Sequence, residues 1–108
     1  MTFTVKRKNN LGLSTADLKN MERIFKKIPQ LKEVVLFGSR AMGNYKRGSD
    51  VDLALKGTID SNIVFQVHDG LEEETQIPYF FDVLNYHKLA NQDLKKHIDE
   101  EGKIIWSQ

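Results

Sequence analysis

The chain has 108 residues, of which 16 are Lys or Arg and 15 are Asp or Glu, so its formal net charge is +1. This length fits one domain of the usual ~50–250 residues, and the balanced charge argues against direct nucleic-acid binding. No cysteine is present, which excludes disulfides and thiolate metal sites. No apolar stretch reaches the ~18 residues needed to span a bilayer, and no secretory signal is recognisable. We therefore expect a cytoplasmic protein without membrane contact.

The first helix is predicted after a polar and basic N-terminal segment. Residues 1–13 are expected to form an N-terminal arm or a short edge strand, and residues 14–108 to form a single domain. Ser14 and Asp17 make a helix-capping pattern, and Pro29 marks the stop. Between them, apolar residues recur at helical spacing, namely Leu18, Met21, Ile24, Phe25 and Ile28.

Two apolar runs then predict strands that follow one another closely. Residues 33–38, EVVLFG, are rich in β-branched and aromatic side chains and end in glycine. Residues 50–55, DVDLAL, alternate charged and apolar positions, which is the pattern of a strand with two different faces. Between these runs, residues 40–45, RAMGNY, are compatible with a short helix.

The next helix and strand are predicted over residues 60–86. Asp60 or Ser61 can cap a helix whose last turn Gly70 is expected to weaken. Residues 79–86, YFFDVLNY, follow a proline and predict a strand.

The C-terminal part predicts one more helix and strand. Asn91 can cap the helix, and Gly102 stands where a left-handed C-cap would be expected. Residues 103–106, KIIW, supply a closing strand. The order helix–strand–strand–helix–strand–helix–strand predicts an α+β (α/β-like) fold, in which helices pack on a small mixed β-sheet.

Three carboxylates interrupt these apolar strands. Asp50 and Asp52 are expected on one face of one strand, ~7 Å apart, where they repel each other. Mg²⁺ prefers such hard oxygen ligands, and Asp82, flanked by apolar residues, is expected to be brought beside the pair. Three acids from two adjacent strands predict a two-metal phosphoryl-transfer site. The alternatives are a solvated strand edge for the pair and a cap or strand-end ion pair for Asp82.

A turn upstream of the acids suits a phosphate ligand. Gly38 lets the backbone approach a ligand closely, and turn N–H groups with the Ser39 hydroxyl can cradle a phosphate. Arg40, Lys46 and Arg47 lie nearby in sequence and are candidates to balance the charge of a triphosphate. The alternative is a solvated basic loop, and Arg40 is the strongest of the three candidates.

These motifs resemble the signature of the DNA polymerase β-type nucleotidyltransferase superfamily. That signature is hG[GS] followed by a [DE]h[DE] pair, and this chain has FGS at 37–39, DVD at 50–52 and a later strand acid, Asp82. The likeness covers residues 14–106, and the compact length is similar to the minimal nucleotidyltransferase (MNT) branch.

The resemblance implies a palm-like nucleotidyltransferase fold and an NTP, preferably ATP, bound with Mg²⁺. Asp50, Asp52 and Asp82 would be catalytic and would ligate metal, and Asp82 would activate the attacking hydroxyl by metal ligation or as a general base. Gly38, Ser39 and Arg40 would bind the nucleotide phosphates. An NMP is then transferred to a hydroxyl and pyrophosphate leaves.

The resemblance also implies a partner protein. MNT proteins commonly pair with a helical HEPN protein as the antitoxin half of a toxin–antitoxin module, and some transfer AMP to a tyrosine of the toxin. The alternative is a non-catalytic, nucleotide-binding antitoxin that neutralises its partner by masking it. A homo-oligomer remains open.

The other conspicuous residues are assigned structural roles. The run EEE at 72–74 is interpreted as a solvated helix end, and Trp106 with the FF pair at 80–81 as core or partner interface. The three histidines lack metal-ligand spacing and are expected at the surface or at caps: His68, His87 and His97.

Overall fold

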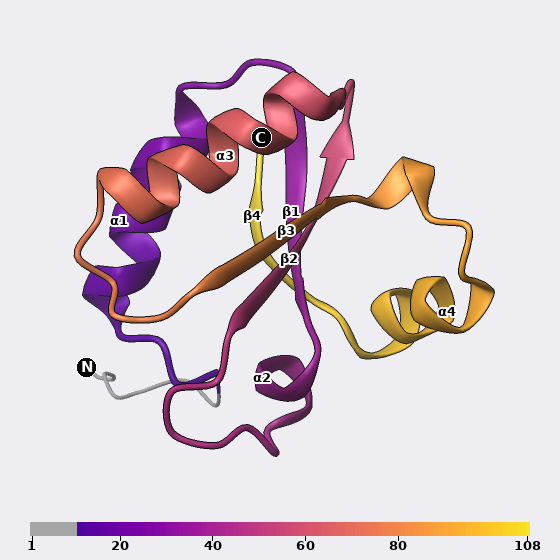
Figure 1. Cartoon of the computed structure of the whole chain (residues 1–108), viewed down its shortest axis with the longest axis horizontal. Coiled ribbons are helices and arrows are strands. Elements are labelled where there is room, and N and C mark those ends of the chain that lie inside the picture. Colours follow the sequence, from indigo (N-terminus) through magenta and orange to yellow (C-terminus); the bar gives the residue numbers. More distant parts are fainter. Residues whose placement is uncertain (1–10) are drawn as a thin grey trace.

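A four-stranded mixed sheet forms the centre of the fold (Figure 1). The computed structural model describes residues 11–108, so residues 1–10 of the expected N-terminal arm lie outside the described part. The strand order is β3-β2-β1-β4; β1 is antiparallel to both neighbours, and β2 and β3 are parallel. The strands are β1 (Leu31–Phe37), β2 (Val51–Gly57), β3 (Phe81–Asn85) and β4 (Lys103–Ser107). The predicted α+β architecture is confirmed.

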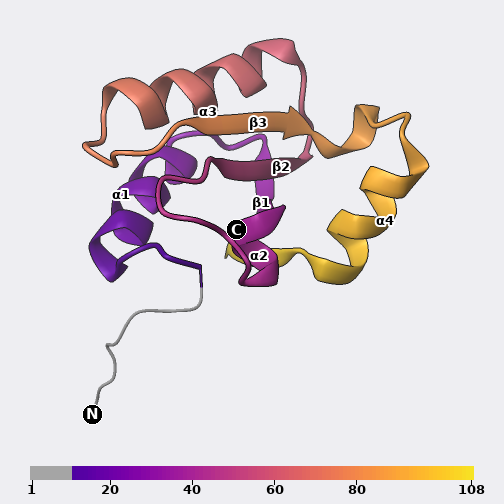
Figure 2. The ribbon, with the colours of Figure 1, turned by 60° about the horizontal axis from the view of Figure 1, so that its bottom comes forward.

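Helices cover both faces of this sheet (Figures 1 and 2). Two long helices, α1 (Thr15–Lys26) and α3 (Ser61–Glu73), lie on one face, and α4 (Gln92–Glu101) lies on the other. A four-residue helix, α2 (Ser39–Met42), follows β1 directly, and a short 3₁₀ helix, η1 (Tyr86–Lys88), follows β3. Within residues 11–108, no helix is long and apolar enough to cross a membrane.

Side-chain caps begin α1, α3 and α4 at the predicted positions. Ser14 and Asp17 form a reciprocal capping box, in which the Asp17 N–H donates to Ser14 Oγ at 3.0 Å and the Ser14 N–H to Asp17 Oδ2 at 3.2 Å. Asp60 caps α3 and Asn91 caps α4, each through its side-chain oxygen.

Two glycines allow close packing, a role that the sequence did not indicate. Gly102 does not adopt the predicted left-handed C-cap, because its φ is −65°; a Cβ there would overlap the Ile98 carbonyl oxygen and Val35. Gly70 lies in the last turn of α3, which it was predicted to weaken, and the helix continues to Glu73. A Cβ on Gly70 would lie 2.8 Å from Ile24 Cγ2, so glycine allows α3 to pack closely on α1.

Side chains along β2 point alternately to the two faces of the sheet, so the strand has a core face and an acid-bearing face. Val51, Leu53 and Leu55 are fully buried and belong to the core beneath α1 and α3. Asp52 and Ala54 occupy the other face of the strand, where Ala54 packs in the smaller core that α4 covers. The acid-bearing face of the sheet is therefore the α4 face.

Candidate active site

The end of β1 and the starts of β2 and β3 meet at one end of the sheet (Figure 1). Asp52 pairs in register with Phe37 of β1 on one side and with Asp82 of β3 on the other. Register partners on neighbouring strands lie ~5 Å apart and project to the same face. The fold therefore places two of the three predicted acids side by side, although they are 30 residues apart in sequence.

Asp50 occupies a different position from the one expected. β2 begins at Val51, so Asp50 lies in the preceding loop, and its side chain is exposed. Its negative charge nevertheless acts on Asp52. The three acids form one electrostatic cluster, in which Asp52 is half-buried and Asp50 and Asp82 are exposed.

Burial and the clustering of the three acids change the pKa of the Asp52 carboxyl. Partial burial, followed by the charges of Asp82 and Asp50, raises the pKa of Asp52 from 3.8 to about 6, while Arg40 and His97 act in the opposite direction. An ionised Asp52 is thus disfavoured by its surroundings, and a bound cation would relieve that repulsion.

The Gly38–Ser39 turn lies against the same carboxylate. Gly38 has a φ of 77°, which favours glycine, and a Cβ at this position would overlap Asp52 Oδ2. Ser39 is half-buried and is the first residue of α2. The turn therefore lies directly beside the half-buried acid of β2.

Arg40 lies beneath the site rather than in its opening. Its side chain is 1% exposed; Nε and Nη2 donate to the Ser49 carbonyl oxygen at 3.1 and 2.8 Å, and Nη1 donates to that of Leu11 at 2.9 Å. The guanidinium carbon also lies 4.2 Å from the Tyr79 ring centroid and 5.1 Å from that of Tyr45. These contacts argue against direct phosphate contact and make Arg40 the buried support of the loop between β1 and β2.

Two other basic residues of this loop remain at the surface. Lys46 and Arg47 are both exposed, so either side chain has the freedom to reach a phosphate.

His97 contacts the site, contrary to its predicted surface or capping role. The Gly38 N–H donates to His97 Nε2 at 2.9 Å, and the imidazole packs edge-on against Phe37, with centroids 6.2 Å apart. His97 precedes the buried Ile98 and follows Leu94 by three positions, so helical periodicity places it on the side of α4 that faces the sheet. This helical position is the sequence feature that could have predicted the contact of His97 with the sheet.

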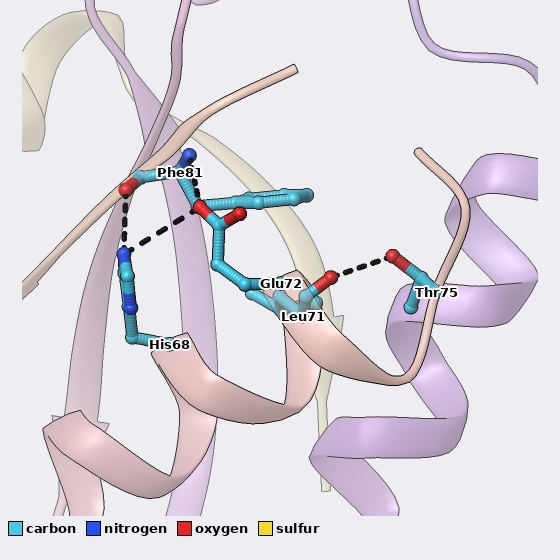
Figure 3. A network of polar contacts seen from close by, with 5 residues as sticks. All are labelled: His68, Leu71, Glu72, Thr75 and Phe81. Atoms are coloured by element: carbon cyan, nitrogen blue, oxygen red, sulfur yellow. Dashed lines mark hydrogen bonds and ion pairs between the residues drawn. The ribbon is translucent and has the colours of Figure 1, made fainter. Parts of the chain in front are cut away.

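Glu72 also departs from its prediction. It does not belong to a solvated helix end, because its carboxylate accepts the Phe81 N–H at 3.2 Å (Figure 3). The two neighbouring phenylalanines differ: the Phe81 side chain is buried, whereas that of Phe80 is 75% exposed.

The carboxylates occupy an open face rather than an enclosed cavity. Three hollows in the described part lie elsewhere: one of about 230 Å³ between α1 and α3 beside Phe65, one of about 360 Å³ beside Asp60 and Asn85, and one of about 240 Å³ beside Arg23 and Thr75. Among residues 11–108, no three His, Cys, Asp or Glu side chains are already grouped as a metal site. The oxygen donors and the mutual repulsion around Asp52 nevertheless suit Mg²⁺, whose shell nucleotide phosphates commonly complete.

Comparisons with known sequences point to one family. The sequence model described as "Polymerase beta, Nucleotidyltransferase" matches residues 19–108. A Methanocaldococcus jannaschii protein named "Putative protein adenylyltransferase MJ0604" is 26% identical over 85 residues, which cover 71% of this chain and 80% of that protein.

Comparisons with solved structures give the same fold. A toxin–antitoxin crystal structure with AMP-PNP is similar with a TM-score of 0.68 and 22% identity, covering 84% of this chain and 73% of that chain. A structure of the tri-AMPylated Shewanella oneidensis HEPN toxin in complex with MNT antitoxin contains a chain that matches with a TM-score of 0.63 and 19% identity, covering 86% of this chain and 71% of that chain. The predicted nucleotidyltransferase fold is therefore confirmed.

Proposed function

Because this chain belongs to the polymerase beta nucleotidyltransferase family, we propose that it transfers AMP from ATP to a hydroxyl group of a HEPN-type partner, as the antitoxin half of a toxin–antitoxin pair. The observation that carries this proposal is the register pairing of Asp52 with Asp82 beside the Gly38 turn. The adenylyltransferase name of the relative and the AMPylated toxin in one structural neighbour support AMP and a protein acceptor.

Asp50, Asp52 and Asp82 would hold Mg²⁺, in a two-metal arrangement, together with the nucleotide phosphates. When bound, Mg²⁺ would polarise the phosphate oxygens and offset the charge of the triphosphate. Gly38 and Ser39 would position the phosphates, since the turn lies against Asp52 and its glycine leaves room for close approach.

The reaction proceeds by in-line displacement. The acceptor hydroxyl oxygen forms a bond to the α-phosphorus, the bond from that phosphorus to the oxygen bridging the β-phosphate breaks, and pyrophosphate leaves with the electron pair. The exposed Asp82 carboxylate is within reach of an acceptor that approaches from solvent, and it takes the hydroxyl proton. An open site of this kind suits an acceptor presented by a second protein, which would supply the missing wall.

The test is transfer to the copurified partner. The protein is purified with the product of the neighbouring gene and incubated with Mg²⁺ and ATP labelled at the α-phosphate. Label should appear on the partner and be lost in Asp50→Asn, Asp52→Asn and Asp82→Asn, but not in Asp69→Asn, which removes an exposed acid of α3. Absence of label with every NTP would favour the masking role over catalysis.

A further inference from the structure

Two side chains of α3 clamp the backbone of a single β3 residue (Figure 3). The Phe81 N–H donates to Glu72 Oε2 at 3.2 Å, and the Phe81 carbonyl oxygen lies 3.1 Å from His68 Nε2. His68 Nε2 and Glu72 Oε2 are themselves 3.6 Å apart. His68 and Glu72 are four residues apart and therefore share one face of the helix.

The direction of these bonds follows from the chemistry of the groups. A carbonyl oxygen only accepts, so His68 Nε2 carries a hydrogen and donates it to Phe81. The Glu72 carboxylate accepts from the Phe81 N–H and faces the same imidazole nitrogen. Both hydrogen-bonding groups of the Phe81 backbone are therefore satisfied by α3.

This clamp compensates for the position of β3 at the edge of the sheet. β3 has β2 as its only strand neighbour among the described residues, and an edge strand leaves backbone groups unpaired. On the inner side, the Val51 N–H donates to the Phe80 carbonyl oxygen at 2.9 Å. The Phe81 side chain is buried in the core beneath α1 and α3. The position of Phe81 is thus held by hydrogen bonds to α3, by the pairing of β3 with β2 and by burial of its side chain.

We propose that His68 and Glu72 are positioning residues for Asp82, an inference that rests on the proposed role of Asp82 in transfer. Asp82 is the next residue along β3 and projects to the opposite face, in register with Asp52. Its own side chain is exposed, so its placement depends on the backbone that carries it. The α3 clamp holds that backbone where the acid can act with Asp52.

Paired variants separate the hydrogen bonds from general stability. Glu72→Ala removes the acceptor and His68→Ala removes the donor, whereas Glu72→Gln and His68→Gln keep an acceptor and a donor of similar reach. Glu74→Gln is the matched control, because Glu74 is an acid at the same helix end whose partner is Lys27, at 2.8 Å, rather than β3.

The first readout is amide exchange at Phe81, followed by NMR in the full chain without nucleotide. Loss of one hydrogen bond worth ~1 kcal/mol should accelerate exchange about five- to tenfold in Glu72→Ala. Glu72→Gln and Glu74→Gln should stay close to the wild-type rate.

The second readout is the register pairing of Asp82 with Asp52, followed by nuclear Overhauser contacts between the backbones of β3 and β2 at these two residues. These contacts should weaken in Glu72→Ala and His68→Ala, and the Gln variants should restore them. Unchanged Phe81 exchange, or faster exchange with unchanged contacts between Asp82 and Asp52, would overturn the proposal. Both readouts need neither nucleotide nor partner, so an absence of AMP transfer by the wild type would refute the proposed function separately.

Discussion

Gly38 and Asp52 approach each other so closely that the glycine has no room for a side chain, because a Cβ on Gly38 would overlap Asp52 Oδ2. The contact joins the turn after β1 to the first acid of β2, and these are the two halves of the family signature. The glycine therefore does two things: it adopts a φ of 77° and it leaves space for a carboxylate.

Gly38→Ala should lower stability by more than the left-handed backbone strain of alanine alone, because the new methyl group would also overlap Asp52. Gly43→Ala is the matched control, because Gly43 has a φ of 80° and open space around its Cβ position. We expect Gly43→Ala to cost ~1–2 kcal/mol of unfolding free energy from left-handed strain. Gly38→Ala should cost more and also displace Asp52, which urea unfolding and the Asp52 carboxyl resonance would measure. Equal effects of the two variants would contradict this interpretation.

Asp52 should make the protein less stable as the pH rises from about 4 to about 6. Burial and the neighbouring acids raise its folded pKa to about 6 from 3.8, so the folded state binds more protons than the unfolded state in this window. The free energy of unfolding therefore decreases with increasing pH there. The difference between wild type and Asp52→Asn in urea unfolding isolates this contribution, and parallel pH curves for the two proteins would rule it out.

The strands and the main acids were predictable because they depend on local patterns. Alternation in residues 50–55 identifies β2 and its polar face, and an isolated acid in an apolar run identifies Asp82. The closeness of Asp52 to Asp82 follows once β2 and β3 are neighbours, which the sequence suggested without fixing their register.

The features that were missed depend on packing between elements. Arg40 belongs to a loop with three basic residues, so nothing local distinguishes the buried base from the exposed ones. Glu72 is one of three consecutive glutamates, and only the docking of α3 beside β3 selects it. Gly102 illustrates a related limit: a glycine is needed either for a positive φ or for close approach, and its sequence position does not tell which.

Arg40 should contribute to stability rather than to phosphate affinity. Arg40→Met would remove the charged donor to the carbonyl groups of Ser49 and Leu11 and the cation–π contact with Tyr79. We expect a loss of ~2–4 kcal/mol in unfolding free energy. Arg47→Gln, which changes an exposed base of the same loop, should stay within ~0.5 kcal/mol. An Arg40→Met protein of unchanged stability with weakened ATP binding would restore the phosphate role.

His97 should stabilise the Gly38 turn from α4, which lies on the acid-bearing face of the sheet. His97→Ala removes the acceptor of the Gly38 N–H, so exchange at that amide should accelerate about five- to tenfold, with ~1 kcal/mol lost in unfolding free energy. His97→Gln offers a carbonyl oxygen in place of Nε2 and should recover part of both losses.

The matched control for His97 lies at the other end of β2, where His87 Nε2 accepts the Gly57 N–H at 3.1 Å. His87→Ala removes the same type of bond and should lower stability by a similar amount. It should not accelerate exchange at Gly38 or weaken ATP binding, because Gly57 and Asp52 are at opposite ends of the register. If His87→Ala and His97→Ala weaken ATP binding equally, the role of His97 is only to stabilise the fold. If only His97→Ala weakens it, α4 is part of the nucleotide site through the hydrogen bond of His97 to the Gly38 turn.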